Sequence, residues 1–310
     1  MSNNALSPLH ILYYGAGWPT NIGNAFIDLG AMALLRAACP DAQIGFASEM
    51  PRWFFGHGTE KAKMDNALDI ASVTQCDLVV FAGMAMCEEF INVNGASVVS
   101  LAKRGIPVLL LGTGALVYSD QEQNLFIDFL KRVNPIGFIS RDNQSYDLFA
   151  NCVKESHKGI DCGFFVSEAY TPFPLQLAPY IVNAFDSTSE PKIELKGRKL
   201  IRAHHDCWGP SQKNYISTDN TLISDIPQDY LTLYANAEEV HTDRVHACVA
   251  TLAYGKLTRL YHPTPRGSLF DAVGCAGIRE QLTQMDMQLL SEKKKIQTAF
   301  AKEIITQIKR

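Results

Sequence analysis

Short apolar runs alternate with longer segments of helical period along most of the chain. The runs are rich in Val, Ile, Leu and Phe, and several contain no charged residue, which is typical of parallel strands buried on both faces. We predict strands at 9–14, 42–47, 77–83, 106–114, 136–140, 180–185, 199–203, 239–241 and 257–261. We predict helices at 25–38, 97–104, 120–133, 143–150, 229–236 and 245–254, and a long closing helix at 278–310. This alternation predicts an α/β protein built on parallel sheets.

A proline-rich stretch interrupts the alternation near the middle of the chain. Residues 171–179 contain three prolines, which can continue neither a helix nor a central strand. A chain of 310 residues is also longer than most single cores. We therefore predict two domains, 1–172 and 179–277, and a closing helix, 278–310, long enough to cross back to the first domain.

Composition narrows the class of protein. Hydrophobic residues make up 47% of the chain and charged residues 19%, as in soluble globular proteins, and the net charge of -4 argues against broad nucleic-acid binding. The first residues do not resemble a signal peptide, and no apolar run is long enough to span a bilayer. The 8 cysteines are scattered without C-x-x-C spacing, as expected in a reducing cytosol. We expect a cytoplasmic protein that is not an integral membrane protein.

Glycines follow two of the predicted strands. The order of strand, glycine loop and helix at 9–38 can cradle a phosphate, although the glycine spacing is not that of a dinucleotide fingerprint. The alternative is that these glycines only permit tight turns. The candidate substrate-binding positions in the two loops are Gly15, Gly17, Asn21, Gly23, Gly112 and Gly114.

Arg244 and His246 stand at the predicted start of helix 245–254. Free backbone N–H groups and the helix dipole favour an anion there. Thr242 or Asp243 could instead cap the helix without any ligand. A histidine in this position should have a lowered pKa, which a bound phosphate would reverse.

Further candidates lie at other element ends. Arg141 follows the strand at 136–140, where ligands bind in open α/β sheets, although it could simply pair with Asp142 or Asp147. The sequence 204–207, His-His-Asp-Cys, resembles a metal site, but neighbouring residues on a strand point to opposite faces, so we predict no metal. The other candidate substrate ligands are Arg202, Arg266 and His205, the last of these with Trp208 on the acceptor side.

Several motifs resemble those of the polysaccharide pyruvyl transferase family. Residues 242–255 are similar to the family's "TxRxHA…LAxG", residues 140–145 to "RDxxS", and residues 159–164 to "GxDxxF". With the glycine loop near the N-terminus, the resemblance covers nearly the whole chain. It implies a GT-B-like fold, with two Rossmann-like domains facing a central cleft.

The resemblance also implies a reaction. Pyruvate would pass from phosphoenolpyruvate to the hydroxyls of a saccharide or lipid-linked saccharide as a ketal, in cell-surface or exopolysaccharide synthesis and without a cofactor. Arginines suit the carboxylate and phosphate of the donor. We assign catalysis to His246, as the acid that protonates the enol carbon, and to Arg244. The protein could act as an oligomer.

Two positions depart from the family pattern. Asn24 stands where "NxGD" has a carboxylate, and Met84 follows Gly83 where relatives have consecutive glycines. These departures leave open a non-catalytic, carbohydrate-binding relative. The same scaffold also suits a glycosyltransferase that uses a nucleotide-sugar donor, because fold does not determine function.

Overall fold

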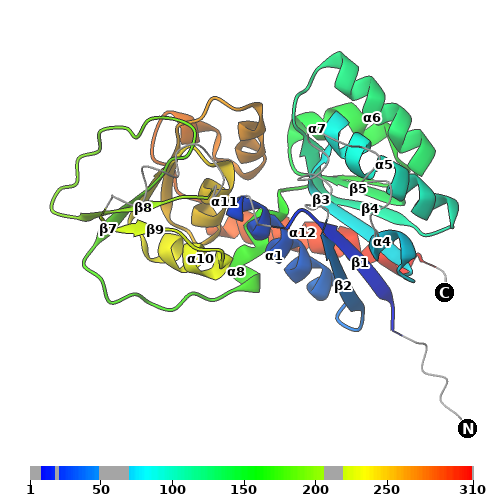
Figure 1. The fold of residues 1–310 in the computed structure, drawn as a ribbon, viewed down its shortest axis with the longest axis horizontal. Helices are drawn as coiled ribbons and strands as arrows, with labels where there is room; N and C mark the ends of the chain where they lie inside the picture. Colours follow the sequence, from blue (N-terminus) through cyan, green and yellow to red (C-terminus); the bar gives the residue numbers. More distant parts are fainter. Residues whose placement is uncertain (1–7, 18–20, 49–69, 206–218, 309–310) are drawn as a thin grey trace, which may run out of the picture.

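Two separate parallel sheets form the framework of the protein (Figure 1). The computed structural model describes residues 8–17, 21–48, 70–205 and 219–308. The first sheet has six strands in the order β2-β1-β3-β4-β5-β6, and the second has five in the order β11-β10-β7-β8-β9. Every strand pair within these sheets is parallel, which confirms the predicted α/β class.

The strands of the first sheet form where the apolar runs lie. All eight residues of β4 are buried, because helices cover the sheet on both sides. β6, which the sequence did not predict, is only three residues long and lies at the sheet edge, so it carries little periodic signal. The strands are β1 (His10–Gly15), β2 (Gln43–Ser48), β3 (Leu78–Met86), β4 (Val108–Ala115), β5 (Gly137–Ser140) and β6 (Ser156–Lys158).

Capping residues determine where the helices of the first half begin. Helix α1 (Ile22–Ala38) starts three residues before the predicted Ala25, because the Asn21 side chain accepts the Gly23 N–H. Helix α6 (Asp120–Val133) matches its prediction and is capped by Ser119. The other helical segments are α4 (Ile70–Val73), α5 (Glu88–Lys103), α7 (Asn143–Phe149), η1 (Ala150–Cys152), η2 (Cys162–Phe165) and α8 (Val166–Ala169).

The prediction for α5 was wrong at its start. The helix begins at Glu88 rather than at Ser97. Glu88 and Glu89 lie in its first turn, where acidic side chains interact favourably with the helix dipole.

The second sheet repeats the same arrangement. Its strands are β7 (Tyr180–Ala184), β8 (Lys199–Ala203), β9 (Thr221–Leu222), β10 (Glu239–Thr242) and β11 (Leu257–Leu260). β9, a two-residue edge strand, was not predicted. Helix α10 (Pro227–Asn236) connects β9 to β10, and helix α11 (Val245–Ala253) connects β10 to β11. All nine residues of α11 are buried, so this helix lies inside the molecule rather than on its surface.

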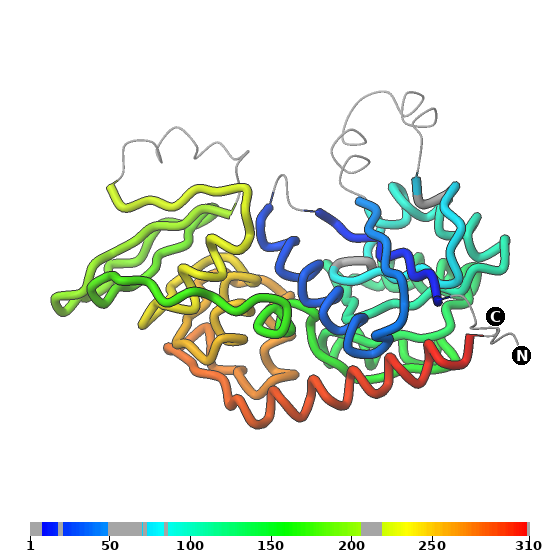
Figure 2. The backbone as a smooth tube through the Cα atoms, turned by 90° about the horizontal axis from the view of Figure 1, so that it is seen from below, coloured from blue at the N-terminus to red at the C-terminus, as the bar shows by residue number. Residues whose placement is uncertain are grey.

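The chain closes with a helix that links the two halves. Residues 265–279 form the short helical segments η3 (Pro265–Val273) and η4 (Ala276–Arg279), and α12 spans Met287–Thr306. The predicted helix 278–310 was therefore too long at its start, where Asp286 caps α12. Figure 2 shows α12 running from the second half of the chain to the first. None of the helices in the described ranges has the length and apolar character that a membrane crossing requires.

One apolar core is shared between the two halves. It contains Leu111 of β4, Phe164 of η2, Val249 of α11 and Ile304 of α12. Because segments from both halves pack in this core, the carboxyl end of the first sheet and the start of α11 are held at a defined separation. That separation determines the geometry of the candidate site.

Candidate functional site

A buried carboxylate brings together two of the motifs that the sequence singled out. Arg141 follows β5 of the first sheet, and His246 lies in the first turn of α11, which follows β10 of the second. Asp161, just before η2, lies between them. Its Oδ2 is 3.6 Å from His246 Nε2 and 3.9 Å from Arg141 Nη1. Side chains that follow strands of both sheets therefore meet at one point.

Arg141 is held rigidly in this position. Its side chain is only 1% exposed, and Nη2 donates a hydrogen bond of 3.0 Å to the Ala115 carbonyl. Its Nε lies 3.8 Å from Asp142 Oδ2, and Asp142 caps α7 by accepting the Ser145 N–H. Nε and Nη1 have no hydrogen-bond partner among the described residues. Buried N–H groups of this kind are suited to an anionic ligand.

His246 is buried at the same point, with 6% of its surface exposed. Burial lowers the pKa of His246, and the charges of Arg141 and Arg266 lower it further, whereas Asp161 raises it. The predicted direction of the shift is thus confirmed, but the main cause is burial rather than the helix dipole. Nε2 has no hydrogen-bond partner among the described residues.

Two more guanidinium groups, those of Arg266 and Arg244, belong to the same cluster. Arg266 is the second residue of η3, and its pKa is lowered to about 10 by burial and by the charges of Arg141 and Arg244. Three positive side chains thus act on one another here, opposed by Asp161. The buried hydroxyl groups of Tyr118 and Ser268, which the sequence did not single out, lie beside them.

Arg244 is oriented by a carboxylate at the end of β7. Its Nε lies 3.4 Å from Asp186 Oδ2. Asp186 Oδ1 accepts a hydrogen bond of 3.1 Å from His204 Nδ1. Burial alone would raise the pKa of Asp186, but the His204 hydrogen bond and the Arg244 charge outweigh it and lower the pKa. Neither expected cap holds α11: Arg244 is the N-cap residue, and Asp243 instead accepts N–H groups from residues 186–188.

His205 lies behind this cluster among aromatic rings. It is buried, and its Nε2 is hydrogen-bonded to the Tyr234 hydroxyl. Burial, helped by the Arg244 charge, lowers the pKa of His205 to about 3, so the ring is neutral at neutral pH. Trp208, which was predicted beside it, lies outside the described residues, as do Asp206 and Cys207 of the metal-like sequence.

Arg202 is not brought to the cluster. Its Nε donates a hydrogen bond of 2.8 Å to Glu190 Oε1, and both side chains are partly exposed. Within the described ranges, its charge is paired with Glu190 and not with Asp161, the carboxylate of the cluster. The ion pair accounts for its position on β8 without any ligand.

The glycines of the two loops mainly make room for other groups. A Cβ atom at Gly114 would lie 2.6 Å from Arg141 Nε, and one at Gly23 would lie 3.1 Å from His246 Cβ. Gly112, with φ +60°, packs against Cys162.

In the first loop, Gly15 packs against Asp28, whose carboxylate accepts the Gly17 N–H. Burial raises the pKa of Asp28 to about 6.

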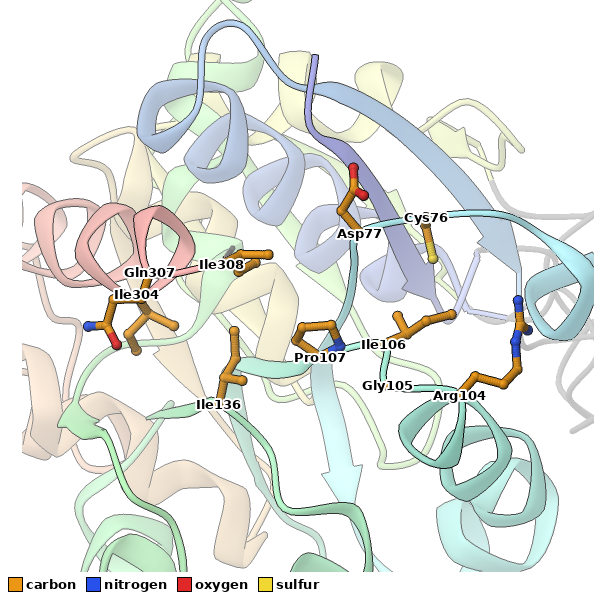
Figure 3. A pocket seen from close by; sticks show the side chains of 10 residues that line it. All are labelled: Cys76, Asp77, Arg104, Gly105, Ile106, Pro107, Ile136, Ile304, Gln307 and Ile308. Atoms are coloured by element: carbon orange, nitrogen blue, oxygen red, sulfur yellow. The ribbon is translucent and has the colours of Figure 1, made fainter. Parts of the chain in front are cut away.

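A surface pocket of about 470 Å³ lies at the end of the first sheet that is opposite to the cluster (Figure 3). Asp77, Pro107 and Ile136, which line it, immediately precede β3, β4 or β5, so the pocket is at the amino ends of these strands. Ligands of open α/β sheets bind beyond the carboxyl ends. We therefore take the Arg141–Asp161–His246 cluster, and not this pocket, as the candidate active site.

The sequence matches the model of a known protein family. The sequence model of the polysaccharide pyruvyl transferase family matches residues 21–258, which include every residue of the cluster except Arg266. No curated protein matches the sequence significantly.

Solved structures of similar fold cover almost the whole chain. S. aureus MnaA with UDP has a TM-score of 0.57 at 9% identity, covering 96% of this chain and 95% of that one. The Neisseria meningitidis UDP-GlcNAc 2-epimerase bound to UDP-GlcNAc has a TM-score of 0.54 at 12% identity, covering 96% and 99%. A functionally uncharacterized Klebsiella pneumoniae protein has a TM-score of 0.50 at 14% identity, covering 88% and 91%. At such identities the likeness concerns the fold alone.

Proposed function

Because the chain belongs to the polysaccharide pyruvyl transferase family, we propose that it transfers pyruvate from phosphoenolpyruvate to two hydroxyl groups of a saccharide, forming a cyclic ketal. The main support for this proposal is a cluster in which His246 lies with three guanidinium groups and the Asp161 carboxylate. The acceptor we propose is a saccharide or lipid-linked saccharide of a cell-surface or secreted polysaccharide. The seven cysteines in the described ranges are free thiols, which supports action in the cytoplasm.

The cluster suits an anionic donor of small size. Phosphoenolpyruvate carries a carboxylate and a phosphate, and guanidinium groups bind both through paired hydrogen bonds. Arg141 offers Nε and Nη1, and Arg244 and Arg266 add charge from the second half of the chain. Burial lowers the pKa of Arg266, and repulsion by Arg141 and Arg244 lowers it further. A bound anion would relieve that repulsion, so donor binding is favoured.

His246 is the group that transfers protons in the proposed reaction. In the proposed first step, protonated His246 gives its proton to the methylene carbon of the donor, and a sugar hydroxyl attacks the adjacent carbon, which becomes cation-like. The proton of that hydroxyl returns to His246. A second hydroxyl then attacks the same carbon, the bond to the phosphate oxygen breaks, and phosphate leaves with the second proton. The products are the ketal and inorganic phosphate.

The protonation of His246 is linked to donor binding. Burial and two arginines lower its pKa in the unliganded protein, which disfavours the acid form. A phosphate bound by those arginines would oppose both effects and raise the pKa. Proton donation would therefore become favourable once the donor is in place.

His246→Gln tests this role. We expect turnover to fall by about 10²–10⁴-fold, because the general acid is lost, while phosphoenolpyruvate binding is kept. Turnover is measured as phosphate release with candidate saccharides and by mass spectrometry of the ketal, and binding is measured by thermal shift. His157→Gln is the matched control: His157 stacks on Phe300 from the short strand β6, and we expect it to keep full activity. If His246→Gln loses phosphoenolpyruvate binding but keeps normal turnover, His246 is not the general acid.

The same assay separates the proposal from its alternatives. Stabilisation by UDP- or GDP-sugars but not by phosphoenolpyruvate would overturn it in favour of a glycosyltransferase. Binding of saccharides with no phosphate release from any donor and acceptor pair would instead indicate a non-catalytic carbohydrate-binding protein.

A further inference from the structure

We infer that Asp161 is a positioning residue for His246: it orients the imidazole and favours the protonated form that donates the proton. This inference rests on the proposed function. It concerns a residue that contacts His246 and Arg141 rather than the substrate.

The two oxygens of Asp161 have different tasks. Oδ1 accepts a hydrogen bond of 2.7 Å from the Gly163 N–H and so caps η2. Oδ2 has no hydrogen-bond partner among the described residues, and it faces His246 Nε2 at 3.6 Å and Arg141 Nη1 at 3.9 Å. The carboxylate is fully buried. One oxygen thus holds the backbone turn, and the other faces the side chains of His246 and Arg141.

The backbone that carries Asp161 is held from two sides. The preceding Ile160 exchanges two hydrogen bonds with the Gln297 side chain of α12. The following Cys162 lies against Gly30 of α1 so closely that no side chain fits there. A carboxylate on such a fixed turn can define the direction of the His246 ring.

The charges around His246 explain why this carboxylate is needed. His246 is faced by Arg141 after β5, by Arg266 in η3, by His205 after β8 and by Asp161. Burial and the arginines lower the pKa of His246, and Asp161 is the neighbour that raises it. Burial would raise the pKa of Asp161 itself, but His246 and Arg141 lower it, so the carboxylate stays ionised. Without Asp161 the pKa of His246 would be lower still, and the acid form would be disfavoured further.

Asp161→Asn tests this assignment with little structural change. The Asn carbonyl can still accept the Gly163 N–H, while the charge facing His246 is lost. We expect the alkaline limb of kcat to move to lower pH by about one unit or more. We also expect kcat at pH 7.5 to fall about 10- to 100-fold, with partial recovery at lower pH. Binding of phosphoenolpyruvate should stay equal or become tighter, because the cluster becomes more positive.

Asp142→Asn is the matched control. Asp142 lies 3.8 Å from Arg141 Nε, a distance similar to that of Asp161 from Nη1, but in the described part of the chain the ion pair of His246 is with Asp161 and not with Asp142. Its removal should leave the alkaline limb in place. If Asp161→Asn does not fold, Asp161→Ser, whose hydroxyl can also accept the Gly163 N–H, should show the same shift.

An NMR titration of His246 separates this inference from the proposed function. If the wild-type protein transfers no pyruvate, the proposed function fails, yet the titration still reports on Asp161. A lower His246 titration midpoint in Asp161→Asn than in the wild type supports the inference. An unchanged midpoint overturns it, as does weakened donor binding with an unchanged kcat profile, which would indicate a purely structural role.

Discussion

At the scale of single residues, Arg202 and Arg266 differ in their charged neighbours, although the sequence named both as candidate substrate ligands. Arg202 has a carboxylate at 2.8 Å, which satisfies its charge within the protein. Arg266 lies among other cations, and its pKa is lowered to about 10. We expect an anion bound in the cluster to gain more from Arg266 than from Arg202, because Arg266 acts on Arg141 and Arg244 of the cluster, whereas Arg202 pairs with Glu190.

Substitution of these two arginines should separate their roles. We expect Arg266→Met to weaken phosphoenolpyruvate binding by about 10- to 100-fold, since a charged hydrogen bond contributes about 1.5–3 kcal/mol. Arg202→Met is the control and should change affinity by no more than about twofold. Isothermal titration calorimetry with both variants measures the difference, and an equal loss would show that Arg202 also binds the donor.

At the scale of elements, the ends of two parallel strands determine where Arg141 lies. β4 and β5 run side by side, so Gly114 near the end of β4 comes next to the Arg141 side chain that follows β5. The absence of a side chain at Gly114 leaves the space that the guanidinium group occupies. This glycine therefore contributes to the site by packing rather than by cradling a phosphate.

Gly114→Ala should displace Arg141. The new Cβ would lie 2.6 Å from Nε, and such overpacking costs about 1–3 kcal/mol of unfolding free energy. We expect donor affinity to fall as well, because Arg141 loses its position. Gly45→Ala on the edge strand β2 is the control: its nearest neighbour would be Leu12 at 3.7 Å, so stability should change by less than about 0.5 kcal/mol. Urea denaturation and calorimetry measure both effects; unchanged binding by Gly114→Ala would contradict this account.

At the scale of the whole molecule, α12 runs from the second half of the chain to the first and packs against the first half. Lys294 Nζ lies 3.1 Å from Glu168 Oε1 and donates to Ser167 Oγ, and Ile304 packs against Gly137 of β5. Gln297 is fully buried and satisfies both backbone groups of Ile160, the residue before Asp161. The last helix of the chain thus supports the turn that carries the site carboxylate.

Gln297→Leu should weaken this support. It leaves the buried Ile160 N–H and carbonyl without their partner, at a cost of about 3 kcal/mol in unfolding free energy. Turnover should fall more than donor affinity, because Asp161 loses its fixed position relative to His246. Gln288→Leu, at an exposed position of the same helix, should stay within about 0.5 kcal/mol of the wild type. Equal unfolding free energies for the two variants would contradict the role of Gln297.

Much of the secondary structure could be predicted because its signals are local. The apolar runs at β4 and β7 and the capped, amphipathic helix α6 carry their own pattern. The short edge strands β6 and β9 carry almost none, and the starts of α5 and α12 depend on caps that the apolar periodicity does not reveal. For the same reason the glycines were recognised, but their packing partners were not.

The sequence by itself determined the α/β class, the family and the residue types of the candidate site, because these depend on local patterns and on motifs that each span a few residues. Only the tertiary structure decided which of those residues meet. It joined Arg141, Arg266 and His246 around Asp161, placed Asp186 on Arg244, and paired Arg202 with Glu190 instead. The physical reason is that contacts between residues far apart in the chain depend on how the two sheets pack around their shared core, and no local pattern records that packing.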